Sequence, residues 1–232
     1  MNNATTTTTT TMRARRLYPT IAVFFCSLLL LSNILAVKPI EVGSFGTTIN
    51  LGSLQLWPLI FDGGAILFPL TYVLGDVISE IYGFKTVRKV IITGFFMELV
   101  AVFTIFIVGL LPSAAGWDND EAFLTILGFV PRIVLASLCG YLVGELLNSF
   151  VLVKIKVKTG NPKLWVRLIG STLVGEAADT LTFCTIAYFG VISLPRFLNY
   201  TIVGYIFKCI LEVVVLPITY RVVAYLKVED PK

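Results

Sequence analysis

Charged and polar side chains interrupt the long apolar stretches of this chain, and they have the chemistry to bind a solute. Glu176 is followed three, four and seven residues later by Asp179, Thr180 and Phe183. This spacing predicts that the four residues share one face of a helix. Lys208 and Glu212 are four residues apart, a spacing that allows them to pair on another helix.

Other ionisable and amide side chains have similarly apolar surroundings: Asp62, Asp76, Glu98, Arg132, Glu145 and Asn148. A charged group near the centre of a bilayer costs at least about 2.5–3.5 kcal/mol, so we expect these side chains to face the protein interior or a water-filled cavity. Acids outnumber the two bases in these stretches, Arg132 and Lys208. The interior therefore favours a ligand that donates hydrogen bonds or carries positive charge.

The usual residues of catalysis and metal binding are missing from this set. The chain has no histidine, its four cysteines form no Cys-x-x-Cys pair, and it has no P-loop sequence. Asp76 and Asp179 raise the alternative of an intramembrane aspartyl protease, which would require Gly-x-Gly-Asp and Tyr-Asp. The chain has Leu74-Gly75 before Asp76 and Ala178 before Asp179. We therefore predict no enzyme, no catalytic residue, no metal and no cofactor.

The composition indicates which elements position these residues. Hydrophobic residues make up 56% of the 232 and charged residues only 14%, with a mean hydropathy of +0.89, whereas soluble domains have about 25% charged residues. Six apolar stretches are long enough to span a bilayer: 17–37, 56–74, 87–111, 123–153, 166–192 and 200–226. We predict an all-α integral membrane protein, a bundle of six transmembrane helices. Gly63, Gly64 and Pro69 predict that the second helix is broken or kinked.

The flanking segments differ from this bundle in composition. Residues 1–12 are rich in threonine and predict a disordered tail, residues 13–228 the transmembrane domain, and residues 229–232 a short C-terminal tail. Residues 38–53 are rich in glycine and partly alternating, so they predict either a small hairpin or a re-entrant loop.

The basic residues indicate an orientation. Lys and Arg cluster around 13–16, 85–89, 154–167 and 221–232, on alternate loops, whereas an acidic cluster at 118–121 lies on the other side. By the positive-inside rule both termini are predicted to be cytoplasmic. The net charge of +4 follows from these short loop clusters, so no nucleic-acid partner is predicted.

Two long motifs resemble those of the queuosine-precursor transporters, once called the vitamin uptake transporter family. They are FPLTYVLGDVISEIYGFK at 68–85 and STLVGEAADTLTF at 171–183. Shorter supporting matches are Ser32-Asn33, Pro131-Arg132 and Phe207-Lys208. The resemblance runs in order along residues 17–226.

This resemblance implies a multi-pass transporter of the cytoplasmic membrane that imports 7-deazapurine precursors of the tRNA nucleoside queuosine. Such precursors include queuine and the smaller aminomethyl and nitrile bases. Carboxylates and amides would accept the ring N–H and amino donors of the base, and Phe183 and Tyr205 would stack on its ring. The predicted binding or translocation residues are Asn33, Asp76, Arg132, Glu145, Glu176, Asp179, Thr180, Phe183 and Lys208.

Two aspects of the assembly stay open at this level. The family fold is similar to the substrate-binding subunits of energy-coupling-factor transporters, so the alternative is a binding subunit that needs a separate ATPase partner. A homo-oligomer is equally compatible with the sequence. The partners predicted in every case are a small-molecule substrate and the lipid bilayer.

Overall fold

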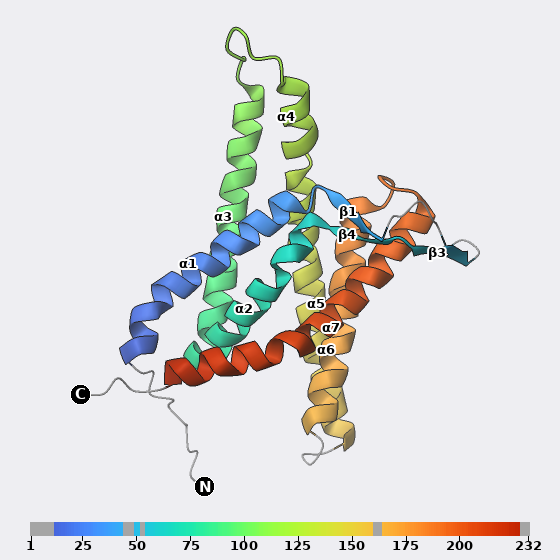
Figure 1. Ribbon diagram of the computed structural model, residues 1–232. Coiled ribbons are helices and arrows are strands. Elements are labelled where there is room, and N and C mark those ends of the chain that lie inside the picture. Colours follow the sequence, from blue (N-terminus) through green and yellow to red (C-terminus); the bar gives the residue numbers. More distant parts are fainter. Residues whose placement is uncertain (1–11, 44–48, 52–53, 160–163, 228–232) are drawn as a thin grey trace.

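The computed structural model describes residues 12–43, 49–51, 54–159 and 164–227, and helices dominate it (Figure 1). The helices are α1 (Met12–Leu35), the 3-10 helix η1 (Gly63–Leu67), α2 (Phe68–Tyr82), α3 (Phe84–Leu110), α4 (Asp120–Leu127), α5 (Val130–Thr159), α6 (Leu164–Tyr188) and α7 (Leu194–Lys227). Four short strands lie between α1 and η1. Most of the predicted threonine-rich tail and all of the predicted C-terminal tail lie outside the described residues.

Five helical segments are long and apolar enough to cross a bilayer: Met12–Leu35, Gly63–Tyr82, Lys85–Leu110, Asp120–Asn148 and Leu194–Lys227. They confirm the prediction of an all-α membrane protein. The fifth predicted span, 166–192, corresponds to α6, which is 25 residues long. The apolar stretch of α6 contains Glu176 and Asp179, the residues that the sequence singles out for ligand binding.

The second predicted span, 56–74, is wrong in its first half. The structure has strands β3 (Leu54–Trp57) and β4 (Leu59–Asp62) there, and the α-helix begins only at Phe68. Asp62 ends the strand and caps η1, because its Oδ1 accepts a hydrogen bond from the Ala65 amide at 2.9 Å. Pro69 then lies in the first turn of α2, where no amide donor is required. The expected break is therefore real and lies before the helix.

The strands form a hairpin-like structure at one end of the bundle. β1 (Pro39–Val42) pairs antiparallel with β4, with Pro39 opposite Asp62, and β2 (Ile49–Leu51) pairs antiparallel with β3. Asn199 of α7 holds β4 in place: its Oδ1 accepts from the Ile60 amide at 3.0 Å, and its Nδ2 donates to the Pro58 carbonyl at 3.1 Å. The described part of residues 38–53 thus agrees with the hairpin alternative.

The fourth predicted span, 123–153, is also interrupted. α4 ends at Leu127 and α5 begins at Val130. Pro131 lies in the first turn of α5, so its missing amide costs no helical hydrogen bond there. In Figure 1, α3 and α4 extend beyond the strands at the top, and α5 and α6 extend at the opposite end.

Helices α5 and α6 pack closely because glycines face each other. A Cβ on Gly144 would lie 3.0 Å from the Gly175 carbonyl oxygen and 2.9 Å from the Asp179 Cβ. A Cβ on Gly175 would lie 2.8 Å from the Asn148 Cβ. Small residues of this kind let membrane helices approach. The close approach holds the polar face of α6 against α5.

Candidate functional site

Lys208 of α7 lies against two carboxylates of α6. Its ammonium group forms an ion pair with Asp179, and its Nζ is 3.8 Å from Glu176 Oε2. The three side chains are only 14%, 24% and 20% exposed, respectively. The pairing predicted between Lys208 and Glu212 is wrong in its partner, since among the described residues the ion pairs of Lys208 are with α6.

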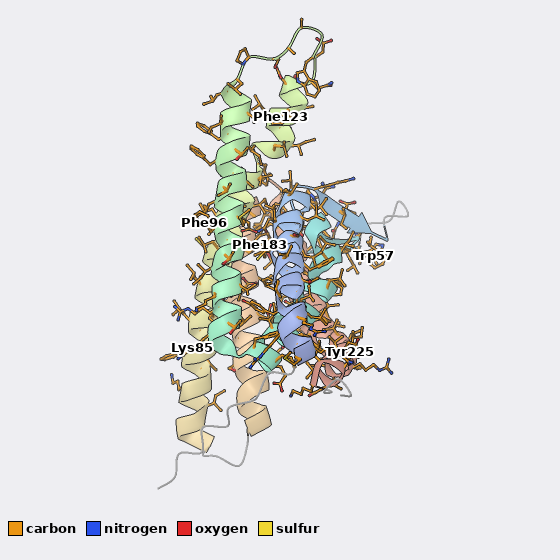
Figure 2. The ribbon with its side chains drawn as sticks, turned by 90° about the vertical axis from the view of Figure 1, so that its left-hand side faces the viewer. Trp57, Lys85, Phe96, Phe123, Phe183 and Tyr225 are labelled. Carbon is orange, nitrogen blue, oxygen red and sulfur yellow. The ribbon has the colours of Figure 1, made fainter. Side chains whose placement is uncertain are left out.

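A cavity of about 120 Å³, here called the hairpin cavity, lies between this ion cluster and the strands. Its lining includes Asn33, Phe61, Asp62, Asp179, Thr180, Phe183, Tyr200 and Lys208. Three of the predicted site residues, Asn33, Thr180 and Phe183, are therefore brought together with Asp179 and Lys208. Phe183 is labelled in Figure 2, where it lies between α3 and α1 in the view.

A second cavity of about 350 Å³, here called the acidic cavity, lies on the other side of the cluster. Four carboxylates line it, namely Asp76, Glu145, Glu176 and Asp179, together with Asn148 and Lys208. Asp179, Lys208, Phe68 and three further residues line both cavities. The ion cluster thus stands at the boundary between the two spaces.

Neighbouring side chains hold the acids of this second cavity. The Tyr72 hydroxyl donates to Glu176 Oε1 at 3.4 Å, and the Thr219 hydroxyl lies 3.5 Å from Asp76 Oδ2. The Lys208 Nζ also lies 5.6 Å from the centroid of the Phe68 ring, within the range of a cation–π contact. Phe68 opens the first family-like motif, so the two motifs meet at this point.

Asp62 and Tyr200 belong to the site and are absent from the sequence-predicted set. The Tyr200 hydroxyl donates to Asp62 Oδ2 at 2.6 Å, and both residues are buried. Each Asp62 oxygen retains a free lone pair that can accept a further donor from the hairpin cavity. The signal in the sequence was an aspartate in an apolar stretch, just before Gly63-Gly64. Because Asp62 lies on a strand and not on the predicted helix, helical spacing did not show which way its side chain points.

Thr180 presents an unsatisfied hydroxyl to the same cavity. The residue is 3% exposed, and its Oγ1 has no hydrogen-bond partner among the described residues. Buried polar groups are normally hydrogen-bonded, so an orphan hydroxyl at a cavity wall indicates a place for a ligand atom or a water. Tyr205, in contrast, is outside both linings, and its hydroxyl lies 3.3 Å from the Leu173 carbonyl.

Arg132 lies away from both cavities. Its Nε donates to the Ile186 carbonyl at 2.6 Å and its Nη2 to the Phe189 carbonyl at 2.9 Å. These carbonyls belong to the C-terminal end of α6, where backbone acceptors lack helical partners. The structure therefore gives Arg132 a capping role at α6 and does not bring it to the other predicted path residues.

This arrangement is suited to one class of ligand. The hairpin cavity offers carboxylate acceptors at Asp62 and Asp179, a hydroxyl at Thr180 and aromatic faces at Phe61 and Phe183. A flat ring with N–H donors along its edge, or a ring that carries an ammonium group, would satisfy all of them. Within the described residues, no three His, Cys, Asp or Glu side chains cluster as metal ligands would.

Known proteins match the chain over most of its length. The family model described as "Putative vitamin uptake transporter" matches residues 62–222. A "Probable queuosine precursor transporter" of Bacillus subtilis (strain 168) is 30% identical over 190 residues, which are 82% of this chain and 77% of that protein. The "Queuosine precursor transporter" of Escherichia coli (strain K12) is 25% identical over 197 residues, 84% of this chain and 80% of that protein.

A third relative extends the match further along the chain. It is a "Probable queuosine precursor transporter" of Haemophilus influenzae (strain ATCC 51907 / DSM 11121 / KW20 / Rd), 26% identical over 213 residues, 90% of this chain and 87% of that protein. No solved structure matches the chain significantly. The motif resemblance is confirmed by these matches, and the chain belongs to the vitamin uptake transporter family, together with the queuosine precursor transporters.

Proposed function

We propose that this chain is a membrane transporter that imports queuosine precursors for tRNA queuosine salvage. The relatives that bear this name cover more than three quarters of this chain. The observation that carries the proposal is the position of the Lys208–Asp179 pair, which separates two cavities inside the transmembrane bundle. An ion pair between two cavities can act as a barrier, because a substrate that binds to Asp179 can displace Lys208 and open the way to the second cavity.

The hairpin cavity would receive the base. The amino and ring N–H groups of the base would donate hydrogen bonds to Asp62. The hydroxyl of Thr180 would gain a hydrogen-bond partner on the base. The ring would lie against Phe61 and Phe183. A purine without the matching donors would leave these buried acceptors unpaired, which is the physical basis for rejecting it.

The basic loop clusters support an orientation with both termini in the cytoplasm. The start of α1 and the end of α7 lie together, since Arg13 Nη1 donates to the Tyr225 carbonyl at 3.3 Å. In this orientation the strands face outward and the acidic cavity lies toward the cytoplasm. Import would then proceed from the hairpin cavity past the ion cluster to the acidic cavity.

Complementation tests the proposed import directly. The host is a bacterium that can neither make queuosine precursors nor import them and that lacks energy-coupling-factor ATPases. We expect this chain to restore queuosine in tRNA when the aminomethyl base is supplied. Asp179→Asn should reduce the modification at least tenfold, whereas Asp118→Asn, an exposed loop change, should not.

The outcomes separate the hypotheses. No tRNA queuosine, with the protein present in the membrane, would contradict the import of this substrate by the chain alone. Recovery only after an energy-coupling ATPase is supplied would favour the binding-subunit alternative. Normal modification with Asp179→Asn would remove Asp179 from the path.

A further inference from the structure

Glu98 is a buried carboxylate that the proposed path does not use. It lies near the middle of α3 and is fully buried (0% exposed). Its Oε1 accepts a hydrogen bond from Asn33 Nδ2 at 2.5 Å, whereas its Oε2 is buried without a hydrogen-bond partner. One neutral donor is poor compensation for a carboxylate charge in a bilayer.

The surroundings of Glu98 offer no cation. The helices packed against α3 are α1, α2, α4 and α5. From α1, Asn33 and the Cys26 thiol act on Glu98. Among the described residues no Lys or Arg is within ion-pair distance of Glu98, and the ammonium of Lys208 is engaged by α6.

The titratable groups that α2 and α5 place in the acidic cavity beside α3 are acids and phenols, and Arg88 of α3 acts on the Tyr141 phenol rather than on Glu98. α2 and α5 contribute Asp76, Tyr141 and Glu145 to the acidic cavity, and the Tyr141 ring packs on Phe95 at 5.7 Å between centroids. The acids of α4 begin at Asp120, which is bound to Ser113 beyond the end of α3. A proton is therefore the counter-charge that the site can accept without rearrangement.

Asn33 connects this carboxyl group to the substrate cavity. Its side chain lines the hairpin cavity while its Nδ2 holds Glu98. The preceding residue, Ser32, donates from its hydroxyl to the Gly64 carbonyl at 3.1 Å, so this end of α1 also touches η1 at the cavity wall. A change in the charge of Glu98 would act on Asn33 and through it on the cavity.

We propose that Glu98 is the proton-binding site that couples import to the proton gradient, with Asn33 as the positioning residue between proton and substrate. This inference rests on the proposed import of queuosine precursors. The proton binds at Oε2, which has no hydrogen-bond partner among the described residues, and Oε1 continues to accept from Asn33, so protonation removes the buried charge and keeps the contact with α1. When the proton leaves, Glu98 becomes a buried anion that attracts the Asn33 amide more strongly. Asn33 transmits this change to the wall of the hairpin cavity.

Transport in proteoliposomes tests the coupling with the full chain and a radiolabelled aminomethyl base. With the membrane potential clamped to zero, symport of one proton gives about tenfold accumulation per pH unit, acid outside. We expect this accumulation from the wild-type chain. Glu98→Gln, which preserves shape and the hydrogen bond from Asn33, should keep exchange between equal substrate pools yet lose accumulation. Glu212→Gln, a carboxyl group of α7 outside both cavity linings, is the matched control.

A spectroscopic measurement is independent of the substrate. The infrared difference spectrum between acid and neutral pH should contain a carboxylic C=O band that Glu98→Gln removes and Asn33→Leu shifts. Its persistence in Glu98→Gln would overturn the proton site whether or not any base is transported. Gradient-driven accumulation by Glu98→Gln, or accumulation driven only by sodium, would overturn the coupling role. Failure of exchange in the wild-type chain would instead count against the proposed substrate.

Discussion

At the residue level, Lys208 decides how much uncompensated charge the bundle contains. It neutralises Asp179 and approaches Glu176 where all three side chains are mostly buried. Removing one member of a buried pair costs about 3–5 kcal/mol, because the charge left behind stays desolvated. Replacing both members by neutral groups of similar shape leaves no such charge. The Lys208–Asp179 pair therefore adds little net stability, and it is better suited to a contact that opens and closes between the two cavities.

This reasoning predicts the stability of two variants. Lys208→Met should unfold at a clearly lower temperature than wild type in detergent, with a loss of about 3–5 kcal/mol. Lys208→Met combined with Asp179→Asn should recover part of that loss, since only Glu176 then lacks a partner. Thermal unfolding of the purified chains measures both. Equal stability of the single variant and wild type would show that solvent already compensates these carboxylates.

The sequence singled out several side chains that line the two cavities, but it did not show how they meet. Helical spacing correctly placed Asp179 and Thr180 on one side of α6, because that relation is local. The partner of Lys208 and the role of Arg132 depend on how α5, α6 and α7 pack, which spacing within one helix does not contain. Asp62 was recognised as a charge in an apolar stretch, yet only the pairing of β1 with β4 turns it toward the cavity.

At the level of elements, the closeness of α5 and α6 positions the acids. Gly140 and Gly144 are four residues apart on α5, and Asp179 packs against them: a Cβ on Gly140 would lie 2.7 Å from Asp179 Oδ1. Any side chain added there would push α6 away and carry Asp179 with it. Stability and transport should therefore fall together when this contact is changed.

Gly144→Ala tests this coupling of packing to function. The added methyl would meet the Gly175 carbonyl oxygen at 3.0 Å, so we expect a destabilisation of about 1–3 kcal/mol and a loss of uptake. Gly170→Ala is the matched control on α6, because it lies outside both cavity linings and its Cβ would meet only the flexible end of the Ile155 side chain, 3.2 Å from Cδ1. Melting temperature and tRNA queuosine content are measured for both. A Gly144→Ala chain as stable as the control would mean that the helices separate at little cost.

The boundaries of the second span show where sequence patterns fail. Residues 54–62 are apolar enough to continue into a helix, and hydropathy alone does not distinguish a buried strand from a helix over so short a run. The strand pairing with residues 39–42 and the Asn199 contacts from α7 decide the outcome. Both are interactions between distant segments, so the sequence predicted the break but not the strands.

At the level of the whole molecule, an ion pair joins α7 to another element at each end of the bundle. At the strand end, Glu41 of β1 approaches Arg196 of α7, with 3.8 Å between Glu41 Oε1 and Arg196 Nη2. At the opposite end, Lys227 Nζ is 2.7 Å from Glu80 Oε1, which joins α7 to α2. α7 is thus joined to β1 at one end and to α2 at the other. Import by alternating access requires each of these contacts to open in turn.

Reversible cross-linking tests that requirement at both ends. Glu41→Cys with Arg196→Cys, bridged by a bifunctional thiosulfonate, should block uptake of the aminomethyl base, and a reducing agent should restore it. Glu80→Cys with Lys227→Cys should behave in the same way, because a substrate that enters must also leave. The four single variants treated with the same reagent control for the native cysteines, of which Cys184 is buried. If uptake continues at the wild-type rate with either end bridged, that end does not move during transport, and the substrate passes through a route other than the two cavities.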